Sequence, residues 1–260
     1  MAIATVVLAL VLAGSAVVLM GSSSKVVVAP HVVAAPVPDG LPSPTEVATP
    51  IVPVASATTI AQVTGPLAFS AQPDGPPVGA LPVGSWWGDT KFLPVIARVP
   101  GWLQVRLPQR PNGLTGWIPE ASATLSTTTL GIVIDVTDHR LRLYDGGHLT
   151  LDVPAGVGTP DDPTPLGDFY LMDIGPSRGA GWGPFVLGTN AHSEAISSWE
   201  GSGDAFTAIH GPLGADAAIG DTGGEISHGC VRLHVDDLAQ LAPVPLGAPV
   251  VVVAHPHPTW

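Results

Sequence analysis

A histidine and a cysteine in the C-terminal half of the chain have the residue types and neighbours that acyl-transfer chemistry requires. The sequence AIHG at 208–211 is followed by a loop rich in glycine and aspartate, and then by SHGCVR at 227–232. A neighbouring imidazole can convert a thiol into the reactive thiolate by taking its proton. A glycine beside the nucleophile lets backbone amides approach a developing oxyanion. We therefore interpret Cys230 as a nucleophile and His210 as its base.

Several other interpretations use the same residues. Cys230 is the only cysteine of the chain, and a lone cysteine is often just a small buried hydrophobic residue. In a strand, His228 would share a face with Cys230, so it is an alternative base. Ser227 is a weaker alternative nucleophile, because a thiol ionises more readily than a hydroxyl, and we place His234 at the surface or at a helix start. Together with His210, these histidines and the thiol could also bind zinc, although a single sulfur next to glycine suits a nucleophile better.

The elements around these residues are mostly strands. Residues 131–136, GIVIDV, are predicted to form a strand. Alternating apolar and polar residues predict strands at 140–144 and 149–153, which the turn Asp145-Gly146-Gly147 joins. The turn TPLG at 164–167 leads into a further strand, and residues 250–254 form the last one. A single short helix is expected at 235–241, ended by Pro243. The C-terminal half is therefore predicted to be a β-dominated domain.

His210, an interval of sixteen residues and the sequence SHGCVR together resemble the signature of the L,D-transpeptidase (YkuD-type) catalytic domain. The TPLG turn and the strand pattern from Gly131 onward agree with this resemblance, which covers about residues 128–254. It implies a β-sandwich-like catalytic domain at 127–255. It also implies peptidoglycan cross-linking through a thioester on the cysteine, with donor and acceptor stem peptides as partners and no cofactor or metal.

The resemblance assigns roles to individual residues. It implies that Cys230 is the nucleophile and His210 the general base, and that the backbone carbonyl of Gly211 orients the imidazole. The backbone amides of His228, Gly229 and Cys230 would form the oxyanion hole. The residues expected to bind substrate are Ser227, Arg232, Trp182 and Phe185, and Arg232 would hold a substrate carboxylate. Residues 175–205, which include Trp199, are expected to form a lid or a wall over the cleft.

The N-terminal half predicts three further segments. Residues 1–24 contain an unbroken apolar run and are interpreted as a signal peptide or a membrane anchor, so we expect an extracytoplasmic protein of the cell envelope. Residues 25–65 are rich in proline, alanine and valine and are expected to be an extended linker without a packed core. Residues 66–126, with the strand pattern WLQVRL at 102–107 and the turn PQRPNG at 108–113, resemble a bacterial SH3-like module.

Charge limits the partners. The nine Lys and Arg and twenty-one Asp and Glu give a net charge of −12, and all of this excess lies in residues 127–260, which hold four arginines and sixteen carboxylates. Such a domain repels polyanions, so we expect no nucleic acid partner, and we expect a monomer with membrane contact only through residues 1–24. The alternative functions are an L,D-carboxypeptidase or another cell-wall cysteine peptidase, and a non-catalytic cell-wall-binding protein.

Overall fold

The computed structural model describes residues 57–81, 90–199, 201–220 and 224–255. Contacts group all of these residues in one compact unit. The predicted signal peptide or anchor at 1–24, and the predicted linker up to residue 56, lie outside the described residues. None of the helices within the described ranges is long and apolar enough to cross a membrane.

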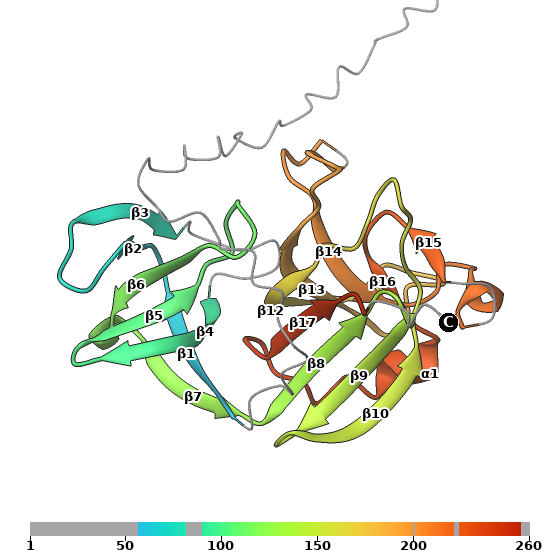
Figure 1. The fold of residues 1–260 in the computed structure, drawn as a ribbon, viewed down its shortest axis with the longest axis horizontal. Helices are drawn as coiled ribbons and strands as arrows, with labels where there is room; N and C mark the ends of the chain where they lie inside the picture. Colours follow the sequence, from blue (N-terminus) through green and yellow to red (C-terminus); the bar gives the residue numbers. More distant parts are fainter. Residues whose placement is uncertain (1–56, 82–89, 200, 221–223, 256–260) are drawn as a thin grey trace, which may run out of the picture. The chain divides into compact units, whose positions relative to one another are not determined.

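The first part of the described chain is a seven-stranded antiparallel sheet with the strand order β3-β2-β6-β5-β4-β1-β7 (Figure 1). Its strands are β1 (Thr58–Thr64), β2 (Leu67–Ser70), β3 (Pro77–Leu81), β4 (Thr90–Val99), β5 (Trp102–Arg106), β6 (Thr115–Pro119) and β7 (Thr124–Thr128). A short 3-10 helix, η1 (Glu120–Ser122), precedes β7. We call this part the N-terminal sheet, and the alternation of β5 buries Leu103 and Val105 in its core, as the sequence predicts.

The linker prediction is wrong for its last residues. Strand β1 pairs with both β4 and β7, and therefore lies inside the N-terminal sheet. Ile60, Ala61 and Val63 are buried. Proline density predicts an extended backbone but does not show whether that backbone finds a partner strand, so the start of the module was placed too late.

The second part is an eight-stranded sheet with the order β10-β9-β8-β17-β12-β13-β14-β16. Its strands are β8 (Leu130–Asp135), β9 (Arg140–Asp145), β10 (His148–Pro154), β12 (Gly167–Pro176), β13 (Phe185–His192), β14 (Phe206–His210), β16 (Val231–Arg232) and β17 (Pro249–Val253). Two short strands, β11 (Val157–Gly158) and β15 (Glu225–Ser227), pair separately, and the helices are η2 (Asp216–Ala218) and α1 (Val235–Ala239). We call this part the C-terminal sheet.

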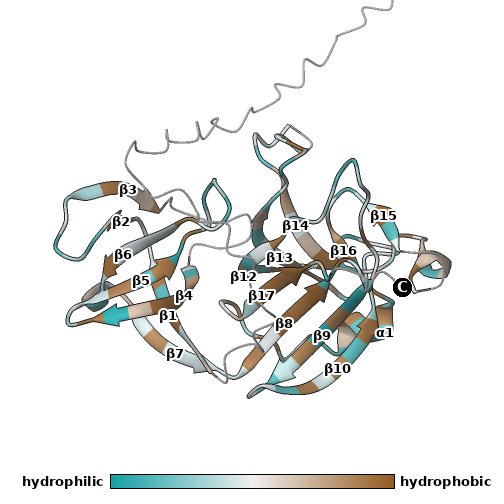
Figure 2. Ribbon diagram, in the orientation of Figure 1, coloured by the Kyte–Doolittle hydropathy of each residue, from teal (hydrophilic) through white to brown (hydrophobic). Residues whose placement is uncertain are grey.

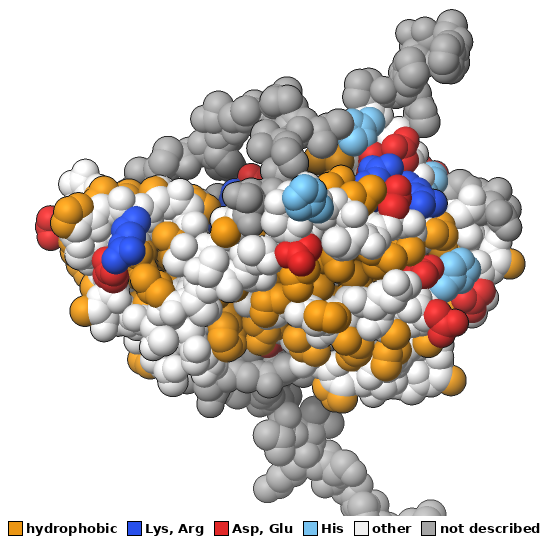
Figure 3. Space-filling model, turned by 90° about the horizontal axis from the view of Figure 1, so that it is seen from below, with side chains coloured by type: hydrophobic (Ala, Val, Ile, Leu, Met, Phe, Trp, Pro, Cys, Tyr) orange, Lys and Arg blue, Asp and Glu red, His pale blue; other side chains and the backbone are white. Residues whose placement is uncertain are grey.

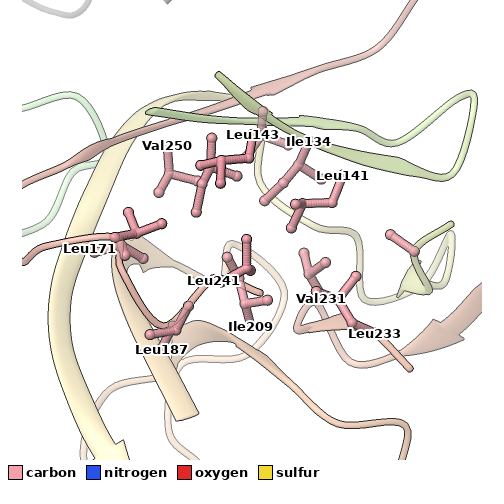
Figure 4. Close-up of a cluster of buried hydrophobic side chains, with 14 of the residues drawn as sticks. Ile134, Leu141, Leu143, Leu171, Leu187, Ile209, Val231, Leu233, Leu241 and Val250 are labelled. Atoms are coloured by element: carbon pink, nitrogen blue, oxygen red, sulfur yellow. The ribbon is translucent and has the colours of Figure 1, made fainter. Parts of the chain in front are cut away.

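One hydrophobic cluster lies inside the C-terminal sheet. Leu141 and Leu143 of β9 belong to the same cluster as Ile209 of β14 and Val231 of β16, although these strands are not neighbours in the sheet (Figure 4). A single continuous sheet therefore curls around its own core, and this produces the sandwich-like arrangement expected from the sequence. Apolar residues are concentrated on β8 and β17 in the middle of the sheet (Figure 2).

The lid prediction is wrong in its middle. Residues 185–192 are strand β13, and all of its residues except Phe185 are buried. Because β13 pairs with β12 and β14, it belongs to the sheet, and irregular structure is left only on either side of it. The family resemblance placed one loop over 175–205, but residues 185–192 of this range form an interior strand.

Two of the four arginines in the acidic half bind nearby carboxylates. Arg140 pairs with Asp152 at 2.8 Å, and Arg142 lies 3.4 Å from Asp135 and 3.5 Å from Asp138. Acidic and basic side chains accordingly lie side by side on the face shown in Figure 3. The other two arginines lie at the site described next.

Candidate active site

The parallel pairing of β14 and β16 brings the two signature segments together. Ile209 pairs with Val231, and His210 pairs with Arg232. Cys230 directly precedes β16 and is two positions from Arg232. Residues two positions apart lie on the same face of a strand, so Cys230 continues the face that carries Arg232. Two segments separated by a long loop thus place the thiol and the imidazole on adjacent backbones.

His210 is buried and held by the backbone that follows it. Its Nδ1 donates to the Gly211 carbonyl at 2.7 Å, and because a carbonyl can only accept, the proton lies on Nδ1 and leaves Nε2 to act as an acceptor. This contact is the one that the family resemblance implies. The ring of Trp182 lies 4.6 Å from the imidazole, centroid to centroid, and the Gly211 amide donates to the Trp182 carbonyl at 2.8 Å. A Cβ on Gly211 would come within 2.5 Å of the Gly181 carbonyl oxygen, so only glycine allows this approach.

The electrostatics of the site favour a neutral pair at neutral pH. Burial lowers the pKa of His210 to about 4, the hydrogen bond to Gly211 opposes this, and the positive charges of Arg232 and Arg178 add to the lowering. Burial raises the pKa of the half-buried Cys230 thiol, against the lowering effects of a backbone hydrogen bond from Ala208 and of Arg232. The site therefore holds a thiol and a neutral imidazole, not a thiolate and an imidazolium.

A network of hydrogen bonds fixes the turn that carries the cysteine. Ser227 Oγ accepts from the Gly229 amide at 3.1 Å and donates to the Cys230 carbonyl. Thr164 Oγ1 accepts from the Gly158 amide at 2.9 Å and donates to the Gly229 carbonyl at 3.0 Å. Gly229 has a φ of +106°, which a residue with a side chain adopts only with strain. Cys230 is thus presented from a turn that several hydrogen bonds hold in place.

This network affects two of the predicted roles. The Ser227 side chain is buried and uses its hydroxyl both as donor and as acceptor within the turn, so it does not line an open surface. The Gly229 amide is also engaged, by Ser227. Of the three backbone amides predicted to form the oxyanion hole, those of His228 and Cys230 take no part in this hydrogen bond with Ser227.

Arg178 and Arg232 provide the positive charge of the site. Arg232 pairs with His210 on the neighbouring strand, and its buried Nε has no hydrogen-bond partner within the described chain. The guanidinium of Arg178 lies 5.0 Å from the centre of the Trp182 ring, a cation–π contact. From the sequence, Arg232 is predicted as a site residue but Arg178 is not. The feature that could have indicated Arg178 is its charge, because it is one of only four arginines in an acidic half.

His228 and Trp199 lie on an exposed side of the site. The two rings are 5.7 Å apart, and His228 Nε2 is 3.8 Å from a carboxylate oxygen of Asp162. Phe185, predicted to bind substrate, is only partly exposed and packs against the hydrophobic core at the start of β13. Of the aromatic residues, Trp182 and Trp199 thus contact the site histidines, whereas Phe185 contributes to the core.

The ligand atoms of a zinc site do not converge here. Among the described residues, the group of His, Cys, Asp and Glu side chains close enough to hold a metal ion is Asp135, Asp138 and His255, and it includes none of the signature residues. His234 instead forms a hydrogen bond with Asp216 at 3.0 Å, in keeping with the surface position expected for it.

Comparison with known proteins agrees with this geometry. Residues 130–252 match the model of the L,D-transpeptidase catalytic domain family, YkuD. YkuD of Bacillus licheniformis, which its name assigns to the L,D-transpeptidases, is 27% identical over 113 residues, which are 44% of this chain. The chain spans only 58% of that relative's length. The matched segment contains the whole C-terminal sheet except the end of β17, and it supports the assignment of this segment to the YkuD family of catalytic domains.

Solved structures were also compared. An L,D-transpeptidase from Mycobacterium smegmatis is 18% identical, with a TM-score of 0.39, over 63% of this chain and 91% of that chain. The catalytic domain of an Enterococcus faecium L,D-transpeptidase is 21% identical, with a TM-score of 0.36, over 48% of this chain and 96% of that domain.

Proposed function

We propose that the protein is an L,D-transpeptidase that cross-links peptidoglycan stem peptides through a thioester on Cys230. The observation that carries the proposal is the hydrogen bond from His210 Nδ1 to the Gly211 carbonyl, on a strand paired with the one that follows the cysteine. That hydrogen bond leaves Nε2 as the proton acceptor. The family match of residues 130–252 supplies the reaction class.

The neutral pair determines how the reaction would start. As the Cys230 sulfur attacks the carbonyl of the donor peptide, His210 Nε2 takes the thiol proton, so that proton transfer accompanies formation of the carbon–sulfur bond. The amides of His228 and Cys230 stabilise the oxyanion. The imidazolium then protonates the leaving amine, the carbon–nitrogen bond breaks, and a thioester remains.

The second half of the reaction transfers the acyl group. An acceptor amine attacks the thioester, His210 takes a proton from that amine, and the sulfur leaves and regains a proton. Arg232 is suited to hold a carboxylate of the peptide, because it pairs with His210 on the neighbouring strand and its positive charge acts on the imidazole in an otherwise acidic domain. Trp182 lies against the imidazole and shields it from water.

The remaining expectations extend this proposal. We propose that the apolar residues 1–24 direct the chain out of the cytoplasm, either as a cleaved signal or as an anchor, because its substrate lies outside. We also propose that the N-terminal sheet is an SH3-like module and that the protein acts as a monomer.

The test is to incubate the full-length protein with a disaccharide carrying a tetrapeptide stem and to identify the products by mass. Dimers linked through the third stem residue are expected, whereas free tripeptide would indicate a carboxypeptidase. Cys230→Ala should abolish turnover, and His148→Gln, a change at an exposed histidine of β10, should not affect it. Unchanged substrate with the wild-type protein, or full turnover with Cys230→Ala, would contradict the proposal.

A further inference from the structure

A turn of the N-terminal sheet is hydrogen-bonded to the segment that follows β13. Arg110 donates from Nε to Asp204 Oδ1 at 2.9 Å and from Nη2 to the Ser193 carbonyl at 2.8 Å. Asn112 donates to the His192 carbonyl at 2.8 Å and accepts from the His192 amide at 2.9 Å. The two side chains thus bind this backbone at several points, in a directional way that apolar packing does not provide.

His192 joins the same network from inside the protein. It is 2% exposed, and its Nδ1 lies 2.9 Å from Asp204 Oδ2 while its Nε2 lies 3.1 Å from the Pro108 carbonyl. Both partners are acceptors, so a ring protonated on both nitrogens satisfies both contacts. Burial raises the pKa of Asp204, but the hydrogen bond and charge of His192, with contributions from Ala205 and Arg110, lower it overall. Asp204 therefore stays ionised beside Arg110 and His192.

Asp204 also holds the backbone of Trp199. The Trp199 amide donates to the Asp204 carbonyl at 2.9 Å, and the Ser193 amide donates to the Ala205 carbonyl at 2.7 Å, which closes the base of the loop. We call residues 193–199 and 201–205 the Trp199 loop. The Trp199 ring lies 5.7 Å from the ring of His228, two residues before the cysteine.

We propose that Arg110 and Asn112 are positioning residues of the active site: they fix the Trp199 loop so that the indole stays against His228 on the wall beside Cys230. The contacts form a chain: the Arg110 guanidinium donates to the Asp204 carboxylate, the Trp199 amide donates to the Asp204 carbonyl, and the indole lies against His228. The N-terminal sheet is then part of the catalytic unit. The effect on peptide turnover rests on the proposed function, but the effect on the thiol does not.

The test uses the single thiol of the chain, since a cysteine reagent then reports on Cys230 alone. The rate of alkylation by iodoacetamide is measured for Arg110→Gln, for Trp199→Ala and for the double variant. Arg110→Gln should raise the rate about threefold or more, because a loosened wall exposes the thiol, and it should add little when Trp199 is already absent. Arg98→Gln is the matched control, since it removes an exposed ion pair with Glu120 in the same sheet.

Two results would overturn the proposal. One is that Arg110→Gln raises the alkylation rate no more than Arg98→Gln does. The other is that Arg110→Gln raises the alkylation rate by the same factor in the wild-type protein and in Trp199→Ala. If Arg110→Gln does not fold, Asn112→Ala replaces it, alone and combined with Trp199→Ala, and the same two criteria apply. Because alkylation needs no peptide, these results are independent of whether the wild-type protein turns over a stem peptide.

Discussion

The hydroxyl of Thr164 is predicted to hold the catalytic turn in place. It accepts from the Gly158 amide and donates to the Gly229 carbonyl, directly before Cys230, and the side chain is 6% exposed. Thr164→Val keeps the shape of the side chain and removes both hydrogen bonds. The valine methyl group would leave two buried backbone groups without partners.

The structure sets the size of the effect. Each buried group that loses its partner costs about 1–3 kcal/mol, so with two such groups the free energy of unfolding should fall by about 2–6 kcal/mol. For a protein of this size, at about 2–4 °C per kcal/mol, that corresponds to a decrease in Tm of about 4–24 °C. A misplacement of about 1 Å at a reacting group can reduce the rate about 100-fold, so at a temperature where the variant is folded we expect turnover to fall about 10- to 100-fold.

The assay combines thermal unfolding by circular dichroism with kcat/KM for stem-peptide turnover. Thr150→Val is the matched control, because the Thr150 hydroxyl makes one partly exposed hydrogen bond to the Leu143 carbonyl. Thr164→Ser should retain most of the activity, since it keeps the hydroxyl. If Thr164→Val were no less stable and no less active than Thr150→Val, the hydroxyl would not be the anchor and the reasoning would be refuted.

Three further predictions concern the charges and the backbone of the site. The acid limb of the pH profile of kcat/KM should lie near the lowered pKa of His210, about 4, and a limb at the ordinary histidine pKa or above would contradict the neutral pair. Arg232→Gln should move this limb to higher pH, because removing a cation favours the imidazolium, whereas Arg140→Gln should leave it unchanged in the same titration. Gly229→Ala should lower the Tm and also the rate of thiol alkylation or of turnover, since Gly229 has a φ of +106° inside the turn. Gly101→Ala is the control: Gly101 has a φ of +80° and open space around it, so this change should lower the Tm alone.

Local patterns in the sequence predicted the elements that depend on near neighbours. Alternation and the Asp145-Gly146-Gly147 turn predicted the pairing of β9 with β10, and the helix predicted at 235–241 is α1, which ends two residues earlier at Ala239. The hydrogen bond between His210 and Gly211 was expected only from the family resemblance, because no local pattern shows which backbone group orients the imidazole.

Contacts between distant segments were not predictable in this way. Thr164 was recognised only as part of a turn, because its partner Gly229 is sixty-five residues further along the chain. Arg178 was not recognised because its place on Trp182 depends on how a loop folds back on the sheet. Strand β1 was missed because its partners, β4 and β7, follow it at a distance.

The position of β17 determines when the C-terminal sheet can form. This strand is the last one described, yet it lies in the middle of the sheet, parallel to β8 and antiparallel to β12. A ribosome must therefore complete the chain through residue 253 before the two halves of the sheet can join. A product that stops before residue 249 would leave β8 and β12 with open edges, which aggregate readily and expose the chain to proteases. Incomplete copies of this protein would thus be open to removal before His210 and Cys230 could be brought together in the assembled sheet.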